Sequence, residues 1–114
     1  MMRIVLADRA VVSAAFGNTI VSTYPDGRKA ELWLHANRTY TAEGRRHDPS
    51  RGHWSVKGRK LCLLQVRPAP MVFSFCTPIP RAGMTAAWPA RAATGEAITV
   101  RLVRGHASAA GKGA

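Results

Sequence analysis

The chain has 114 residues, of which 46% are hydrophobic, and its formal net charge is +11. This length predicts one domain with a real core and excludes a substrate domain joined to a separate cofactor domain. No window approaches the ~20 consecutive apolar residues that a membrane-spanning helix needs, so we predict no transmembrane segment.

The N-terminal segment, residues 1–16, contains a short apolar run that Asp8 and Arg9 interrupt. A secretory signal needs an unbroken apolar stretch after its basic start, so we interpret the segment as a short helix or as the remnant of a targeting segment. Asp8 is suited to begin a helix, and four apolar residues of that helix would pack against the rest of the domain. These are Val11, Val12, Ala15 and Phe16.

Short segments with strand character follow from residue 18, and turn residues separate them. Alternating or β-rich patterns predict strands over 18–24, 29–35 and 38–43. In the second of these, Trp33 lies on the face opposite Leu32 and Leu34, so we expect Trp33 to be exposed. Residues 44–52 have no apolar side chain apart from one proline and are predicted to form an exposed basic loop.

The strongest strand signal lies at residues 53–66. Trp54 and Val56 alternate with polar neighbours, which is the period of a half-buried strand. Gly58 permits a tight reversal, and the returning strand, 61–66, is apolar on both faces. We therefore predict a β-hairpin whose second strand lies in the middle of a sheet or under another layer.

The C-terminal half contains weaker signals. Residues 67–70 form a rigid connection because their prolines cannot donate to a sheet. Strands are predicted over 71–76, 84–88 and 97–104, and Pro89 is expected to end the second of them. Residues 105–114 are small, polar and rich in glycine, and we predict that they form a disordered tail.

About eight short strands without a long helix predict an all-β fold with one antiparallel meander. Closing such a sheet into a barrel removes its exposed edges and creates a lumen wide enough for side chains or one small ligand. We place this barrel domain at residues 17–104.

Several motifs in this region resemble one known group of proteins. They are Gly17-Asn18-Thr19-Ile20, Tyr24-Pro25-Asp26-Gly27, Asn37-x-Thr39-Tyr40, Gly52-x-Trp54-x-Val56-x-Gly58-x-x-Leu61-Cys62, and Cys76. In order and spacing they are similar to small secreted proteobacterial β-barrels of lipocalin-like type, most of which have no assigned activity. The resemblance implies a lipocalin-like barrel, export and a disulfide, but it carries over no catalytic residues.

The two cysteines, Cys62 and Cys76, fall on strands predicted to be neighbours. A bridge between them would close a loop of about 15 residues, add about 3 kcal/mol to stability, and indicate a periplasmic or secreted protein. In the alternative, both are reduced and buried in a cytoplasmic protein whose true N-terminus is Met1.

The positive charge suggests an anionic partner, such as nucleic acid or a membrane surface. Arginine outnumbers lysine by 13 to 4 and is spread along the chain, so a solvated, incidentally basic exterior is the alternative. Two carboxylates, Glu43 and Asp48, flank the basic loop and are expected to pair with its arginines. The candidate anion-binding residues are Arg45, Arg46, Arg51, Arg59 and Lys60.

Chemical motifs are scarce. The histidines lack metal-site spacing, although His47, Asp48 and His53 could form a loop site. We find no phosphate-cradling glycine loop and no nucleophile elbow, and we therefore predict no catalytic residues and no cofactor.

The sequence thus supports two hypotheses. The first is a non-enzymatic barrel that binds a small apolar or amphipathic molecule, or a partner protein. The second is a module that binds anions or nucleic acid through the basic loop. The candidate lumen residues, each of which could instead fill a packed core, are Leu32, Leu34, Tyr40, Trp54, Val56, Phe73, Phe75, Val100 and Leu102.

Overall fold

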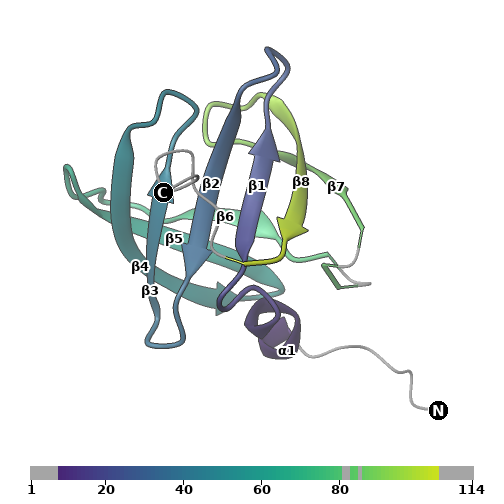
Figure 1. Ribbon diagram of the computed structural model, residues 1–114. Helices are drawn as coiled ribbons and strands as arrows, with labels where there is room; N and C mark the ends of the chain where they lie inside the picture. The colour runs from purple at the N-terminus through teal and green to yellow at the C-terminus, as the bar shows by residue number, and fades with distance from the viewer. Residues whose placement is uncertain (1–7, 81–82, 85, 106–114) are drawn as a thin grey trace.

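One antiparallel sheet of eight strands curves around the core of the protein (Figure 1). The structure is a computed structural model, and it describes residues 8–80, 83–84 and 86–105. The helix and strands are α1 (Asp8–Ser13), β1 (Thr19–Thr23), β2 (Lys29–Leu34), β3 (Thr39–Glu43), β4 (Pro49–Lys57), β5 (Lys60–Arg67), β6 (Phe75–Pro78), β7 (Trp88–Arg91) and β8 (Ala97–Val103).

The strand order makes this sheet a nearly closed barrel. It runs β6-β5-β4-β3-β2-β1-β8-β7, so β1 pairs with both β2 and β8 while β6 and β7 are the edges. None of the described strand pairings joins β6 to β7. The predicted all-β barrel with an N-terminal helix is therefore confirmed, and its closure is incomplete at one seam.

Helix α1 covers one end of the barrel (Figure 1). Val11, Val12 and Ala15 are buried in the core cluster, as the spacing of these apolar residues predicts. The Phe16 ring lies 5.8 Å from the Trp54 ring, between centroids. Trp54 in turn donates a hydrogen bond from its indole nitrogen to the His35 carbonyl oxygen, at 2.8 Å. This end of the barrel is consequently sealed by packed side chains.

Strand β4 is longer than the sequence suggests. It begins at Pro49, opposite Glu43 of β3, so the exposed loop is shorter than the predicted 44–52. Polarity misled the prediction because the backbone pairs with β3 whatever the side chains are. Gly52 lies where the register of β4 against β5 shifts, and a Cβ there would overlap the carbonyl oxygen of Leu64. Only glycine permits this close approach of the two backbones.

Two predictions in the C-terminal half are wrong. Strand β6 begins at Phe75 rather than at Met71, and the Phe73 side chain is 82% exposed. Strand β7 starts at Trp88 and contains Pro89, which was expected to end a strand. A proline is tolerated there because β7 is an edge and needs hydrogen bonds on one side only.

The prediction that Trp33 is exposed is also wrong, because only 6% of this residue is exposed. It lies on the face of β2 away from the lumen, where its indole nitrogen donates to the Thr19 hydroxyl at 2.9 Å. The Thr19 hydroxyl donates to the Gly105 carbonyl oxygen at 2.7 Å. Apart from Gly105, the predicted disordered tail, residues 105–114, lies outside the described residues. In the part of the chain that the structure describes, no helix is long and apolar enough to cross a membrane.

Candidate ligand-binding cavity

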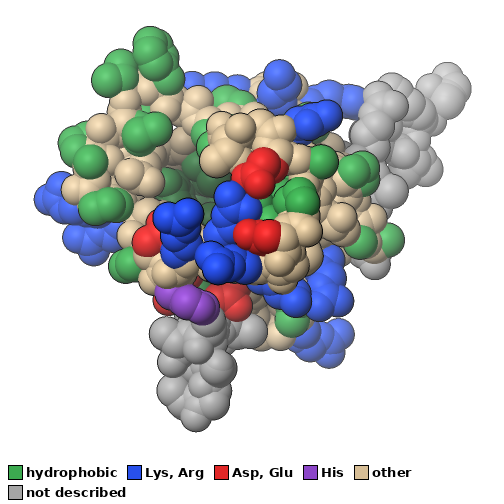
Figure 2. Space-filling model, turned by 90° about the horizontal axis from the view of Figure 1, so that it is seen from above, with side chains coloured by type: hydrophobic (Ala, Val, Ile, Leu, Met, Phe, Trp, Pro, Cys, Tyr) green, Lys and Arg blue, Asp and Glu red, His purple; other side chains and the backbone are tan. Residues whose placement is uncertain are grey.

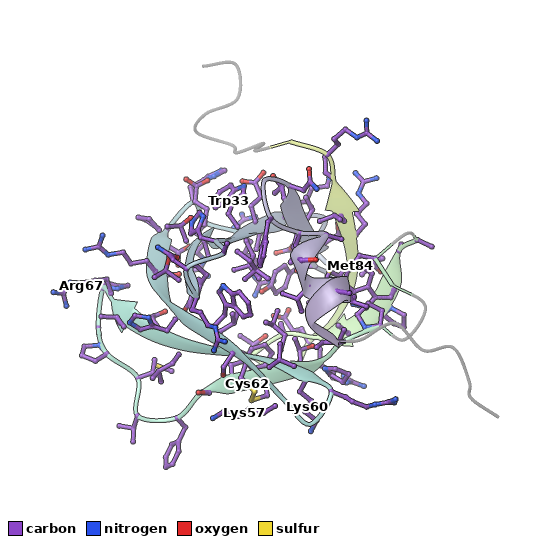
Figure 3. The ribbon with its side chains drawn as sticks, turned by 90° about the horizontal axis from the view of Figure 1, so that it is seen from below. Trp33, Lys57, Lys60, Cys62, Arg67 and Met84 are labelled. Atoms are coloured by element: carbon purple, nitrogen blue, oxygen red, sulfur yellow. A yellow bond between two sulfur atoms is a disulfide. The ribbon has the colours of Figure 1, made fainter. Side chains whose placement is uncertain are left out.

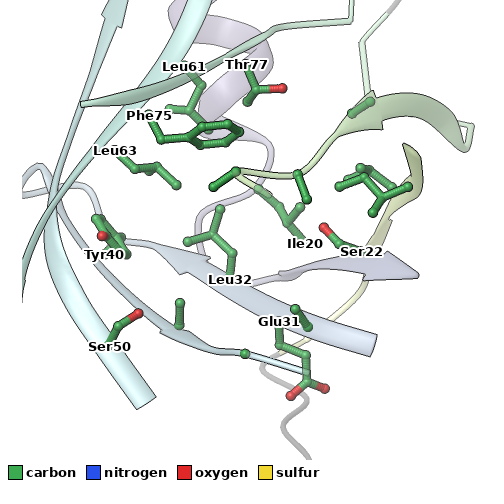
Figure 4. A pocket seen from close by; sticks show the side chains of 18 of the residues that line it. Ile20, Ser22, Glu31, Leu32, Tyr40, Ser50, Leu61, Leu63, Phe75 and Thr77 are labelled. Atoms are coloured by element: carbon green, nitrogen blue, oxygen red, sulfur yellow. The ribbon is translucent and has the colours of Figure 1, made fainter. Parts of the chain in front are cut away.

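A cavity of about 540 Å³ lies inside the barrel, and its lining extends from loop residues such as Tyr24 and Ala92 to Leu61 and Ile79 near the β4–β5 turn. It opens at the end formed by the β1–β2, β3–β4 and β7–β8 loops, which we call the mouth. Apolar side chains from different strands point toward one another across it (Figure 4). These include Ile20, Leu32, Leu61, Leu63 and Phe75. The volume lies within the range of about 300–1,000 Å³ that is usual for small-molecule sites.

Side-chain size changes along the barrel axis. Near the mouth, the inward positions of four neighbouring strands hold the small residues Ser22, Ala30, Ala42 and Ser50. Ser22 lies opposite Ala30 and Ala42 lies opposite Ser50, while Leu32 lies opposite Ala42 between these two pairs. Toward α1, the barrel is filled by large side chains. The cavity is therefore the space that the small residues leave above a packed floor.

The predicted lumen residues divide between the cavity and the core. The cavity is lined by Leu32, Tyr40, Phe73, Phe75 and Val100. The remaining four belong to the core or pack against it, and they are Leu34, Trp54, Val56 and Leu102. Phe73 reaches the cavity only at its outer edge, from the exposed β5–β6 loop.

Tyr40 places a polar group on the cavity wall. Only 4% of this residue is exposed, and no described residue forms a hydrogen bond with its hydroxyl. Burial raises the pKa of Tyr40 above its ordinary value of 10.0, so the hydroxyl is neutral at physiological pH and can donate a hydrogen bond. Because Tyr40 lines the cavity, a ligand acceptor could receive this hydrogen bond.

Arg45 ties together three loops at the mouth. Its guanidinium donates to both carboxylate oxygens of Glu96, at 2.8 and 3.3 Å, and lies 3.4 Å from Asp26. Its Cζ atom lies 4.2 Å from the centroid of the Tyr24 ring, which lines the cavity. Figure 2 shows acidic and basic side chains gathered on this end of the molecule.

These contacts differ from the predicted pairing of the loop arginines with Glu43 and Asp48. Arg45 instead reaches acidic residues of two other loops, which sequence proximity could not reveal. The hydrogen bond from Thr94, followed by that from Arg45, lowers the pKa of Glu96 below its ordinary value of 4.5. The Glu43 carboxylate lies 3.7 Å from the Nδ1 atom of His47.

The structure does not bring the five candidate anion-binding residues together. Arg45 and Arg46 lie in the loop at the mouth, whereas Arg59 and Lys60 lie at the turn between β4 and β5, at the other end of β4. Arg51 is exposed on β4 itself. Seen from the α1 end, Lys60 lies beside Cys62, well away from Arg67 (Figure 3).

Cys62 and Cys76 form a disulfide, as predicted. They are direct partners in the β5–β6 register, on the opposite face from the inward-pointing Leu61 and Leu63. Cys62 is buried, whereas Cys76 is exposed. The bridge links the short edge strand β6 to β5, the strand with which it pairs (Figure 3).

No three metal-ligating side chains converge within the described residues. His47 and Asp48 lie in the loop at the mouth, and His53 lies on β4. They do not form the loop site considered from the sequence.

Several residues that line the cavity were not predicted from the sequence, notably Tyr24, Ala30, Ala42 and Ser50. A usable signal was present, because small residues at inward positions mark where a lumen is left unfilled. Comparisons of the chain with protein-family models, curated proteins and solved structures found no match.

Proposed function

We propose that this protein is a non-enzymatic binding module that holds one small apolar or amphipathic molecule in the barrel cavity. The observation that carries the proposal is the cavity of about 540 Å³, which has small inward residues near the mouth and an otherwise largely apolar wall. Burial of an apolar ligand in this space contributes about 25 cal/mol per Å² of area removed from water.

The Tyr40 hydroxyl supports an amphipathic ligand. A neutral phenol cannot balance a full negative charge in a largely apolar space, so its natural partner is an uncharged acceptor such as a carbonyl, ester or hydroxyl oxygen. The rest of the ligand would contact the aliphatic and aromatic wall, for example Leu32 and Phe75. The proposed ligand class is therefore an apolar molecule with one uncharged oxygen acceptor.

Titration with fluorescent apolar probes tests this proposal. N-Phenylnaphthylamine should bind saturably, with one probe per protein. Ala42→Leu fills the cavity and should weaken binding about tenfold or more. Ala97→Leu is a matched control, because Ala97 is exposed on β8 outside the cavity lining. A folded protein without saturable binding, or with equal binding in the two variants, would refute the proposal.

A second variant tests the role of Tyr40. Tyr40→Phe removes one hydroxyl and should weaken binding of the carbonyl-containing probe Nile red by roughly two- to tenfold. Binding of N-phenylnaphthylamine, which has no carbonyl group, should change much less. Equal losses for both probes would show that the hydroxyl does not recognise an acceptor.

The anion-binding alternative stays a prediction, and salt separates it from the first proposal. Binding of single-stranded nucleic acid would weaken steeply with salt because it releases counterions. Binding of an uncharged probe in the cavity would not. Replacing Arg45, Arg46 and Arg51 with alanine should abolish nucleic-acid binding if the loop is responsible.

We further propose that the protein acts in an oxidising compartment such as the periplasm. The Cys62–Cys76 disulfide is compatible with such a compartment. Membership of the lipocalin-like group of secreted barrels is likewise a proposal that rests on the sequence motifs. The mass of native protein purified without reductant should be lower by two hydrogen atoms than that of the reduced protein.

A further inference from the structure

An exposed apolar tip projects from the barrel beside the cavity. It consists of Met71, Val72 and Phe73 in the β5–β6 loop, which are 54%, 85% and 82% exposed. These are the large hydrophobic residues most clearly left in solvent among those described. Folded monomers usually scatter such residues singly, and a contiguous exposed set indicates a surface that contacts something else.

The loop that carries this tip is constrained. Met71 donates a backbone hydrogen bond to the Gln65 carbonyl oxygen at 3.0 Å. The Gln65 side-chain amide donates to the Ala69 carbonyl oxygen, also at 3.0 Å. Two prolines, Pro68 and Pro70, restrict the backbone further. The tip is thus presented by a loop with its own hydrogen bonds, and little ordering entropy is lost when it binds.

Two exposed arginines lie at the base of the loop. Arg67 lies directly opposite Arg51 in the β4–β5 register, and both are exposed. Neither forms an ion pair within the described part of the chain. Adjacent like charges repel, so this pair is favourable only near an anion.

The excess of basic over acidic residues extends along the sequence from residue 49 to residue 95. Residues 49–95 contain no Asp or Glu. The same stretch contains seven basic residues, and they are Arg51, Lys57, Arg59, Lys60, Arg67, Arg81 and Arg91. The described members of this set come from the β4–β7 region, which includes the apolar tip. An apolar insertion next to unopposed cations is complementary to a bilayer that contains anionic lipids.

We propose that the Met71–Phe73 tip docks this protein on an anionic lipid bilayer. The tip enters the boundary between headgroups and acyl chains, while Arg51 and Arg67 contact lipid phosphates. A nucleic acid fits the tip less well because only one of its three side chains, Phe73, has an aromatic face on which a base could stack. A protein partner would require a broad surface of about 800 Å² rather than a narrow apolar tip.

This docking goes beyond ligand binding and does not depend on it. The two are spatially related, since Met71 and Phe73 also line the outer edge of the cavity. A docked tip would bring that edge against the membrane, where apolar molecules dissolve. Ligands could then pass between the bilayer and the barrel without crossing much water.

Sedimentation of the full chain with lipid vesicles tests the proposal. The protein should bind vesicles of phosphatidylcholine mixed with phosphatidylglycerol, bind phosphatidylcholine alone weakly, and dissociate from the mixed vesicles as salt is raised. Phe73→Ser and Val72→Ser should each lower partitioning about tenfold. Both side chains are exposed, so the variants should keep the wild-type circular dichroism spectrum.

A matched pair of double variants tests the local role of charge. Arg51→Gln with Arg67→Gln should lower binding to the anionic vesicles by about tenfold or more. Lys57→Gln with Lys60→Gln removes the same charge from the other end of the β4–β5 hairpin. This variant should lose much less binding to the anionic vesicles. Equal losses would show that only net charge matters and would overturn the docking geometry.

Other outcomes would also overturn it. These are absence of binding to anionic vesicles, or binding that Phe73→Ser leaves unchanged. A lipid-free dimer abolished by Phe73→Ser, without vesicle binding, would assign the tip to a second copy of the chain. Ala42→Leu should affect probe binding but not vesicle binding, so failure of the ligand proposal can be distinguished from failure of this one.

Discussion

Arg45 connects three loops at the mouth of the cavity. Its side chain is 24% exposed, and the acidic partners Asp26 and Glu96 are 46% and 36% exposed. Ion pairs this close to solvent contribute little to stability, because water and salt screen them. Their geometric effect is larger, since a single guanidinium holds the β1–β2, β3–β4 and β7–β8 loops together and covers Tyr24. We therefore expect Arg45 to influence ligand exchange more than folding.

We call the contacts of Arg45 with Asp26 and Glu96 the clamp. Acidification should weaken it. The folded-state pKa of Glu96 lies below 4.5, so its stabilising contacts with Thr94 and Arg45 are present above that value and are lost as the pH falls through the lowered pKa. Probe dissociation, followed by stopped-flow fluorescence, should accelerate over this acidic range. The Glu96→Gln and Arg45→Gln variants should release the probe quickly at neutral pH. Their dissociation rates should change less with acid than the wild-type rate does.

Arg46→Gln provides a control for this prediction, because Arg46 neighbours the clamp but is exposed and forms none of its contacts. The probe should dissociate from this variant at the wild-type rate at every pH. If Arg45→Gln does likewise, the clamp does not gate the cavity.

At the level of elements, alternation predicted the paired strands well and the solvent-facing apolar segment poorly. Trp54 and Val56 lie on the inner side of β4, as their spacing indicates. The same logic failed at Phe73, because periodicity cannot reveal that an apolar side chain is left in water. Gly52 carries information that pattern analysis also misses, since its requirement comes from the Leu64 backbone on another strand.

Strand β6 depends on its disulfide. It has four residues and pairs with β5 alone. Cys62→Ala with Cys76→Ala should lower the free energy of unfolding by about 3 kcal/mol, measured by urea denaturation, because the open chain gains entropy when unfolded. Probe affinity should also fall, since β6 positions Phe75 on the cavity wall.

Reductant separates the bridge from the side chains themselves. It should lower the urea midpoint of the wild-type protein toward that of the double variant and leave the double variant unchanged. A wild-type midpoint that does not respond to complete reduction, confirmed by mass, would contradict a stabilising role for the bridge.

On the scale of the whole molecule, the sequence predicts a barrel and its helix but not the division into a cavity and a packed floor. That division depends on which inward residues share a level, such as Ala42 beside Ser50, and hence on the strand register. Register is a long-range property that a single strand does not encode. The incomplete closure has a local cause instead. Both edges contain a proline, Pro78 in β6 and Pro89 in β7, and neither proline can donate to a neighbouring strand.

This open seam should govern the dynamics of the barrel. Each residue of β2 and β3 lies between two paired strands, whereas β6 and β7 have a sheet partner on one side only. Local opening costs least where fewest backbone hydrogen bonds must break, so amide hydrogens of β6 and β7 should exchange faster than those of β2 and β3. Hydrogen exchange followed by mass spectrometry would resolve the difference. A bound probe should slow exchange in β6 and β7, because Phe75 and Trp88 line the cavity from these strands. Equal protection in β2 and β6 would mean that the seam is closed in solution, and ligands would then have to enter through the clamped mouth.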